Sequence, residues 1–477
     1  MATPHHHHHL VFICNPAIGN LVPAVEFAVR LVRHDPRFLA TFLALDIPGR
    51  PLVNAYTQSR FSASPSQNIQ FIAIPSVQPP SPALFHSHIG YLSLYFDSYK
   101  PHVKQAIIDL QNPRNSGRVV GVFVDMFTTA FIDVANDLQI PSYLFFASPA
   151  TFLSLMVQLP KMDRDRVESS IRDSDAEFVL PSFAHPLTSS LLPSTVLKTR
   201  DGLLWYTHHG RRYGETNGVV INSFTELEPH ALSSLGEIPP VYAVGPLLDL
   251  GGPAQWQPSR ATHQSVLKWL DGQPERSVVL LSFGSMGSLD KAQVREIAFG
   301  LERAGFRFVW VVRQPPKTHL EHPDDYSDLD HVLPDGFVTR TAGLGLVCGW
   351  VPQVSILSHS AIGGFVSHCG WNSILESLWF GVPIATWPVY AEQQMNAFEM
   401  VKELELAVEL RLDYREGSNL VTAKELETAL RRLMDGGDDV RARVKRMGEK
   451  CRTVLLENGS SYTALNSLIE KLTAQIL

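Results

Sequence analysis

Short apolar runs alternate with amphipathic stretches along this chain, and they fall into two blocks. The first block has apolar runs at 10–14, 39–45, 70–74, 119–124, 142–146, 219–222 and 241–244. The second block has them at 278–283, 306–312, 344–348, 363–366 and 383–385. Short apolar runs are typical of strands buried on both faces, and helical patterns between them predict parallel sheets. The sequence therefore predicts an α/β chain with two doubly wound parallel sheets.

A segment rich in glycine and proline, residues 245–260, separates the two blocks and predicts a linker. We predict a His-rich lead-in at 1–9, a first domain at 10–248, a linker at 249–262 and a second domain at 263–477, whose last helix can pack back on the first domain. The five histidines His5–His9 precede the first predicted strand. We therefore leave them out of the site prediction, as a tag remnant or a low-complexity lead-in.

Charge and cysteine content exclude several classes of function. The chain has a formal net charge of −7 and no basic block, which argues against a nucleic-acid partner. Its four cysteines show no CxxC spacing and predict free thiols in a reducing, cytoplasmic compartment. The best apolar run, Phe145–Val157, has 13 residues, too few for a transmembrane helix. We expect a monomer without a membrane span.

The densest polar segment is His368-Cys-Gly-Trp-Asn-Ser373, which follows the predicted strand 363–366 and opens a helix. A strand, a glycine-containing turn and a helix start form an anion site, because free N–H groups and the helix dipole face the ligand. Ser373-x-x-Glu376 also fits a capping box, which would give both side chains a purely structural role. Both interpretations stay open at this point.

Residues 350–393 form a 44-residue segment with many distinctive residues at fixed spacing. It contains Trp350-Val-Pro-Gln353, Gly363-Gly-Phe-Val-Ser-His368, Gly381-Val-Pro383 and Glu392-Gln393. It closely resembles the signature of plant secondary-product UDP-glycosyltransferases, family 1 glycosyltransferases. The resemblance covers essentially the whole chain. The segments 145–150 and 410–418 resemble the subgroup that acts on small phenolics, flavonoids and terpenoids.

The resemblance implies the GT-B architecture, in which two Rossmann-like domains face each other across a cleft. The acceptor binds to the first domain and the UDP-sugar to the second. The residues at the matching donor positions are Ser285, Trp350, Val351, Gln353, His368, Trp371, Asn372, Ser373, Glu376, Glu392 and Gln393.

Each donor position carries an implied role. Trp350 stacks on uracil, the Val351 main chain and Gln353 reach its edge and the ribose, and Glu376 accepts the ribose hydroxyls. Ser285, His368, Asn372 and Ser373 cradle the diphosphate, and Glu392 with Gln393 binds the sugar. The family usually shows Trp371 and Gln393 when the sugar is glucose.

We expect no cofactor, since UDP-glucose is a co-substrate, and no metal. Fixed hydrogen-bond donors and a helix N-terminus can stabilise the departing diphosphate. The competing metal motif, Asp328-Leu-Asp330, lies in an acidic loop at 324–330 rather than at a strand end. A solvated surface loop is the better interpretation.

On the acceptor side, the family uses a histidine as base and an aspartate that orients it. Asp125, at the end of the predicted strand 119–124, matches the aspartate, but Asn20 stands at the histidine position. Asparagine cannot act as a base at neutral pH. Asn20 is then an engineered change, or a native residue serving acceptors that ionise easily, with Asp125 or water as proton sink. Otherwise another histidine is the base, and the candidates are His86, His88, His208 and His209.

The acceptor pocket is hard to predict from sequence. Phe85, Phe127, Phe146 and Met156 could line an apolar slot, although core packing explains them equally well. We predict an inverting UDP-glucosyltransferase that glucosylates a hydroxyl, in our interpretation phenolic, of a small lipophilic plant metabolite. The alternatives are glucose-ester formation on a carboxylic acid and a UDP-sugar-binding protein with impaired turnover. An NAD-dependent oxidoreductase fits the sheets, but 15–20 lacks the G-x-G-x-x-G motif.

Overall fold

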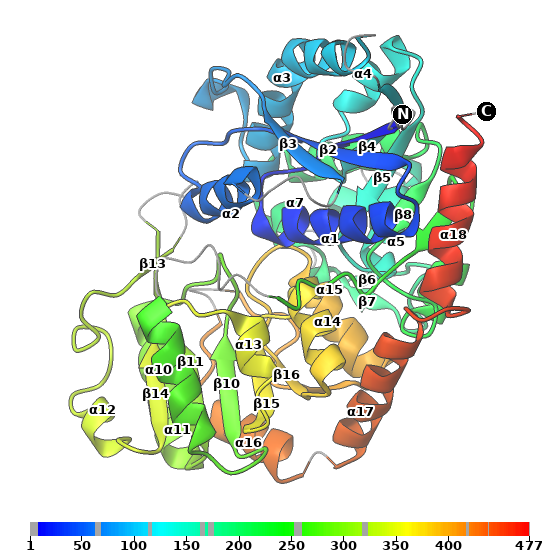
Figure 1. The fold of residues 1–477 in the computed structure, drawn as a ribbon. Helices are drawn as coiled ribbons and strands as arrows, with labels where there is room; N and C mark the ends of the chain where they lie inside the picture. Colours follow the sequence, from blue (N-terminus) through cyan, green and yellow to red (C-terminus); the bar gives the residue numbers. More distant parts are fainter. Residues whose placement is uncertain are drawn as a thin grey trace.

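The computed structural model describes residues 8–62, 68–112, 117–162, 167–169, 176–251, 260–316, 323–415, 419–436 and 438–476. Two parallel sheets lie one above the other, each with helices on both faces (Figure 1). The prediction of two doubly wound parallel sheets is confirmed.

The first sheet has seven strands in the order β3-β2-β1-β4-β5-β8-β9, and all neighbouring pairs are parallel. The strands are β1 (His8–Ile13), β2 (Phe38–Ala44), β3 (Ile69–Ala73), β4 (Arg118–Asp125), β5 (Ser142–Phe146), β8 (Val219–Ile221) and β9 (Val241–Ala243). The strand order reverses between β1 and β4. Ligands of such sheets bind where the order reverses, beyond the carboxyl ends of the strands.

The strands of the first sheet alternate their side chains between two cores. Val11 and Ile13 of β1 enter one core, while Leu10 and Phe12 enter the other, as the two-residue period of a strand requires. The α-helices around these cores are α1 (Ile18–His34), α2 (Pro51–Ser62), α3 (His88–Leu110), α4 (Phe131–Asp137), α5 (Ala150–Gln158), α7 (Ser194–Lys198), α8 (Gly202–Tyr213) and α9 (Pro229–Ser233). A short ribbon pairs β6 (Glu177–Phe178) with β7 (Leu187–Thr188).

The second sheet has six parallel strands in the order β14-β11-β10-β15-β16-β17. The strands are β10 (Val278–Ser282), β11 (Arg307–Val311), β14 (Gly345–Cys348), β15 (Ile362–Ser367), β16 (Ile384–Thr386) and β17 (Ala407–Glu409). The α-helices of this half are α10 (Arg260–Asp271), α11 (Lys291–Ala304), α12 (Phe337–Arg340), α13 (Gln353–Leu357), α14 (Trp371–Phe380), α15 (Gln393–Phe398), α16 (Ala423–Met434) and α17 (Asp438–Thr453). A π-helical turn, Glu399–Glu403, follows α15.

The last helix, α18 (Ser460–Thr473), leaves the second half and lies beside the first (Figure 1). Its apolar side chains Leu465, Leu468, Ile469 and Leu472 belong to the same core as Leu10 and Phe12. The chain therefore crosses between the halves twice, once through the predicted linker and once after α17. Of that predicted linker, residues 252–259 lie outside the described residues.

Some predicted boundaries are wrong for identifiable reasons. The first strand begins at His8, so the last two residues of the predicted lead-in belong to β1, where His9 Nδ1 lies 3.0 Å from Thr41 Oγ1. His5–His7 lie outside the described residues. The 13-residue apolar run at 145–157 is the end of β5 joined to α5, whose residues 150–157 are all buried. A helix buried all round shows no amphipathic period, so the pattern did not reveal it.

Candidate active site

A cavity of about 340 Å³ lies between the two sheets. Its walls come from segments that follow β1, β4, β5 and β9 in the first half and β10, β14, β15 and β16 in the second. The carboxyl ends of both sheets therefore face one cleft, where ligands of parallel sheets bind. The predicted residues on its walls are Asn20, Phe127, Ser285, Trp350, Val351, Gln353, His368, Trp371, Asn372, Ser373, Glu376, Glu392 and Gln393.

Trp350 and Gln353 lie on one wall, in the segment after β14. The Trp350 backbone N–H donates to Asp325 Oδ1 at 3.0 Å, and its side chain is partly exposed on the cavity. Gln353 Nε2 donates to Glu376 Oε2 at 2.7 Å and to Ser373 Oγ at 2.8 Å. Burial raises the pKa of Glu376 to about 7, although the Gln353 hydrogen bond acts against the shift. A flat aromatic face thus lies near an amide and a carboxyl group.

The N-terminus of α14 forms the floor of the cavity. Gly370 is its N-cap and makes no side-chain cap, so the capping-box interpretation of Ser373 and Glu376 is wrong. Glu376 lies one turn further on and bonds Gln353 instead. The first-turn residues 371–373 line the cavity, and their N–H groups have no side-chain cap, which suits an anion site.

His368 is packed so closely between two glycines that a side chain at either position would force it to move. A Cβ atom at Gly284 would lie 2.4 Å from His368 Nε2, and one at Gly370 would lie 2.5 Å from it. Gly284 also has a φ of +76°, which favours glycine. Burial lowers the pKa of His368 to about 4, so the imidazole is neutral at pH 7. His368 therefore offers a hydrogen bond, not a positive charge.

Trp371 and Asn372 connect α14 to the first half. Trp371 is buried, and its Nε1 donates to the Asn222 carbonyl at 2.7 Å. Asn372 Nδ2 donates to the carbonyl of Gly19 at 2.9 Å. The Trp371 indole N–H is therefore occupied, while the Asn372 amide touches the segment that carries Asn20.

Glu392 and Gln393 lie opposite, after β16. Ser148 of the first half donates from Oγ to Glu392 Oε1 at 3.2 Å. Gln393 is buried, and its Oε1 accepts from the N–H groups of Val389 and Tyr390. These bonds fix the side-chain amide of Gln393 at the cavity wall.

Asn20 and Asp125 meet on the first half, as the resemblance implied. Asn20 Nδ2 donates to Asp125 Oδ2 at 2.8 Å. The contact exists because β1 and β4 are neighbours in the sheet, so the segment after β1 lies against the end of β4. Asp125 is fully buried, and its Oδ1 accepts from the Phe127 backbone N–H at 3.0 Å.

The environment of Asp125 changes its acidity. Burial raises its pKa to about 7, against the hydrogen bonds from Phe127 and Asn20. An amide cannot remove a proton, so Asn20 can only donate to Asp125 and accept through Oδ1. The pair can orient a hydroxyl group, and of its two members only Asp125 can bind a proton.

Neither His86, His88, His208 nor His209 lies on the cavity wall. His86 and His208 are exposed, and His88 Nε2 is 2.8 Å from Arg50 Nη2. His209 is buried between Ser93 and Thr129, and burial lowers its pKa to about 3. The structure gives no support to these histidines as a replacement base.

Two of the four predicted acceptor-pocket residues belong to the core instead. Phe146 and Met156 are fully buried and lie in the core cluster around β5 and α5. Phe85 packs at a centroid distance of 5.2 Å from Tyr91 and lies outside the cavity wall. Phe127 does line the cavity. Strand residues of this sheet point into its cores, so the segments after the strands supply the wall.

Several wall residues were missed by sequence reasoning. They are Ile18, Val22, Pro23, Met126, Ala147, Ser148, Leu247, Leu248, Asp249 and Tyr390. Ser148 follows β5 directly, so the rule that ligands bind beyond strand ends could have found it. Asp249 had no such signal, because it lies in the segment that the sequence marked only as a linker.

The acidic loop is a surface feature. Asp328 and Asp330 are exposed, and the Asp330 N–H donates to Asp328 Oδ1 within the loop. Asp325 pairs with Arg313, and β12 (Arg313–Gln314) bonds β13 (Asp324–Asp325). Within the described ranges, no three His, Cys, Asp or Glu side chains are grouped to hold a metal ion. The same residues contain no helix with the length and apolar character to cross a membrane.

Comparisons with known proteins agree with this geometry. The family model "UDP-glucoronosyl and UDP-glucosyl transferase" matches residues 246–441. UDP-glycosyltransferase 43 from Pueraria montana var. lobata is 54% identical over 473 residues, covering 98% of this chain and 99% of the relative. A Fragaria ananassa protein named "Putative UDP-glucose flavonoid 3-O-glucosyltransferase 3" is 47% identical, covering 97% of this chain and 99% of its own. The crystal structure of Medicago truncatula UGT71G1 with UDP-glucose superposes with a TM-score of 0.89 at 42% identity, covering 98% of this chain and 99% of that one.

Proposed function

This chain belongs to the UDP-glycosyltransferase family and is a UDP-glucosyltransferase, and from that premise we propose that it glucosylates a phenolic hydroxyl of a small lipophilic plant metabolite. The observation that carries the proposal is the single cavity that joins the predicted donor residues to Asn20 and the apolar Phe127. The strawberry relative named for flavonoid glucosylation supports a flat phenolic acceptor. The proposed division is an acceptor domain at 10–248 and a donor domain at 263–477.

The donor would lie along the second half. Trp350 offers its face to uracil, and Glu376 offers two oxygens to the ribose hydroxyls. The uncapped N-terminus of α14, with Ser285, His368, Asn372 and Ser373 beside it, suits a diphosphate. Glu392 and Gln393 would bind the glucose hydroxyls. Since these fixed donors can stabilise the charge of the leaving UDP, the proposed mechanism needs no metal and no cofactor.

The reaction would be a single displacement with inversion. The acceptor oxygen forms a bond to the anomeric carbon while the bond from that carbon to the diphosphate oxygen breaks, and UDP leaves with the electron pair. Asn20 Oδ1 can accept a hydrogen bond from the acceptor's O–H, but the amide cannot take the proton. Since Asp125 is buried behind Asn20, the proton would leave through water, with Asp125, whose pKa is about 7, as the group that can bind it. An acceptor that is already ionised needs no such transfer.

A second candidate, glucose-ester formation, is favoured by one observation. The buried Asp125 carries an amide partner instead of an imidazole, so the base that a phenol requires is weakened. A carboxylic acid is ionised at neutral pH and attacks without a base. For either acceptor, we propose that the enzyme works as a monomer in a reducing, cytoplasmic compartment, to which its four buried free cysteines are suited.

The test compares the chain with Asn20→His, with Asn20→Gln as a control that keeps an amide. UDP-glucose turnover is assayed on a flavonol and on a benzoic acid, at neutral and mildly alkaline pH. A histidine base should speed up phenol glucosylation by about 10²-fold or more, because general-base catalysis contributes about 10²- to 10⁴-fold. The β-configuration of the glucoside, read from its anomeric NMR coupling, tests inversion.

The outcomes separate the candidates. Phenol turnover that rises in Asn20→His but not in Asn20→Gln supports phenol chemistry with a weakened base. Preferred turnover of benzoic acid by the unmodified chain, with no gain from histidine, supports ester formation. Failure of all three proteins to turn over either acceptor would contradict both candidates.

A further inference from the structure

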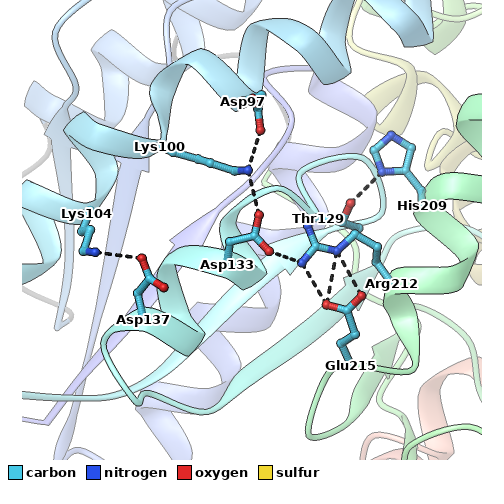
Figure 2. A network of polar contacts seen from close by, with 9 residues as sticks. All are labelled: Asp97, Lys100, Lys104, Thr129, Asp133, Asp137, His209, Arg212 and Glu215. Carbon is cyan, nitrogen blue, oxygen red and sulfur yellow. Dashed lines mark hydrogen bonds and ion pairs between the residues drawn. The ribbon is translucent and has the colours of Figure 1, made fainter.

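A chain of hydrogen bonds lies behind the acceptor wall and centres on His209 of α8. His209 Nε2 is 2.8 Å from Ser93 Oγ of α3. On the other side of the ring, His209 Nδ1 is 2.7 Å from Thr129 Oγ1, which follows β4 (Figure 2). All three side chains are buried. The imidazole thus joins two helices of the first half to the segment that continues from Asp125.

The partners determine which ring nitrogen carries the proton. Ser93 has one hydroxyl proton, and it donates that proton to the Ile89 carbonyl at 2.7 Å. Ser93 Oγ must therefore accept from His209, which places the proton on Nε2. His209 Nδ1 is then an acceptor for the Thr129 hydroxyl. Burial keeps the ring neutral by lowering its pKa to about 3, and the nearby His208 and Arg212 act in the same direction.

The segment held by Thr129 contains two residues of the proposed acceptor site, Phe127 on the cavity wall and Asp125 buried behind Asn20. The Asp125 N–H donates to Thr128 Oγ1 at 2.7 Å, and Thr128 Oγ1 donates to the Ile13 carbonyl. Phe127 donates its backbone N–H to Asp125, and its ring lies edge-on to His209 at a centroid distance of 5.5 Å. One imidazole therefore contacts both the backbone segment of Asp125, through Thr129, and the ring of Phe127.

Ion pairs fix the helices around this imidazole. Arg212, one turn after His209 on α8, pairs with Asp133 of α4 and with Glu215 (Figure 2). Lys100 of α3 pairs with the same Asp133 at 2.7 Å. These ion pairs connect α3, α4 and α8. The fold therefore fixes the distance between Ser93 and Thr129, which His209 bridges.

We propose that His209 is a positioning residue for the acceptor: its neutral Nε2–H imidazole holds the segment 125–129 so that Phe127 lines the cavity and Asp125 stays hydrogen-bonded to Asn20 of the wall. This inference rests on the proposed acceptor roles of those two residues. The imidazole itself touches no reacting atom. Its loss should therefore change acceptor binding and turnover while leaving the donor half unaffected.

The experiment uses four variants of the full chain. Thr129→Val removes one hydroxyl without changing the shape, and His209→Leu removes the whole bridge. His209→Gln keeps one uncharged donor and one acceptor and is the rescue variant. His208→Gln, at the exposed neighbour on the same helix, is the matched control.

For Thr129→Val and His209→Leu we expect kcat/KM for a flavonol acceptor to fall about 10- to 100-fold, since small displacements near a reacting centre have effects of that size. The Kd for UDP should stay within about twofold, and His209→Gln should recover most of the loss. A purely structural role would instead lower thermal stability and affect donor and acceptor constants alike. If Thr129→Val and His209→Leu both match the unmodified chain, or if UDP affinity falls with acceptor affinity, the inference is wrong.

The tautomer gives a test that does not depend on turnover. In the unmodified protein, the ¹⁵N shifts of the His209 ring should show a proton on Nε2 and none on Nδ1, with no titration near neutral pH. A proton on Nδ1 would overturn the inference. If the unmodified chain turned over no hydroxyl acceptor, the proposed function would fail, while the nitrogen shifts and flavonol binding by the variants would still decide the role of His209.

Discussion

Each half of the cleft holds a carboxyl group bonded to the side-chain amide of a residue on the cavity wall. In the first half, Asn20 Nδ2 lies 2.8 Å from Asp125 Oδ2, and in the second, Gln353 Nε2 lies 2.7 Å from Glu376 Oε2. Burial raises the pKa of both carboxyl groups to about 7. The local chemistry of the two pairs is therefore nearly the same, although the resemblance gives them different tasks.

The two pairs differ in how the chain assembles them. Gln353 and Glu376 are 23 residues apart, within consecutive strand–helix units, whereas Asn20 and Asp125 are 105 residues apart. The Gln353–Glu376 pair is set by local spacing, which a sequence motif can record. The Asn20–Asp125 pair depends on β1 and β4 being neighbours in the sheet, which only the topology provides.

The largest effect we expect is that pH changes kcat through Asp125 and the Kd for UDP-glucose through Glu376. Asp125 is protonated below its pKa of about 7, so it cannot accept a proton there. The kcat for a phenol should then fall about tenfold for each pH unit below about 7 and level off above it. Glu376 should change the Kd for UDP-glucose over the same range, because only its ionised form accepts through both oxygens.

Two variants assign these titrations. Asp125→Asn should remove the pH dependence of kcat and leave that of the UDP-glucose Kd. Glu376→Gln should remove the pH dependence of the Kd and leave that of kcat.

The pH dependence of stability gives an independent check on the direction of the Asp125 pKa shift. Between its ordinary pKa of 3.8 and about 7, Asp125 keeps its proton only in the folded state, so stability falls as pH rises through that window. Asp125→Asn should flatten this fall in thermal melts; an unchanged slope would contradict the raised pKa.

The next effect tests the close packing of the second half. Gly284→Ala places a Cβ 2.4 Å from His368 Nε2 at a φ of +76°, and Gly343→Ala is its control, with a φ of +79° and nothing within 4 Å. Both should lose about 1–2 kcal/mol of stability, the strain of a left-handed alanine. Only Gly284→Ala should also weaken UDP binding, by about 1–3 kcal/mol, because His368 must move. Equal UDP affinities by calorimetry would remove His368 from the donor site.

A third effect tests the aromatic wall. Trp350→Ala should weaken UDP binding by about 1–3 kcal/mol if the indole stacks on uracil, by analogy with base–aromatic stacking. Trp379→Ala, on α14 outside the cavity, is the control, since Trp379 packs against the core of the second half. It should lower the midpoint of urea unfolding while leaving the UDP Kd within about twofold. No change in the UDP Kd of Trp350→Ala would rule out stacking.

The same difference between local and long-range contacts limits how much of the site the sequence could predict. The positions of the motif at 350–393 that we predicted for the donor all line the cavity, because they follow three consecutive parallel strands, β14, β15 and β16, whose carboxyl ends lie at one edge of the sheet. The motif gave no sign that the Trp371 N–H bonds the Asn222 carbonyl, a contact between residues 149 positions apart. Phe146 and Met156 were wrongly assigned to the pocket because an apolar residue looks the same in a sequence whether it lines a core or a cleft. The place of Ser148 after β5 could be predicted, but its contact with Glu392 could not, since Glu392 belongs to the other half.

Removing the Ser148–Glu392 hydrogen bond should give the smallest effect on donor binding, and it tests most directly whether the two halves act together. Ser148 donates to Glu392 Oε1 at 3.2 Å, and this bond lowers the pKa that burial raises. In Ser148→Ala, Glu392 loses a donor, so the KM for UDP-glucose should rise about 2- to 10-fold, the effect of roughly 0.5–1.5 kcal/mol. The Kd for UDP, which lacks the sugar, should not change. Ser154→Ala, buried on α5 outside the cavity, controls for the lost hydroxyl. If UDP and UDP-glucose weaken equally, Ser148 acts by holding the two halves together and not by orienting the carboxylate that we propose binds the sugar.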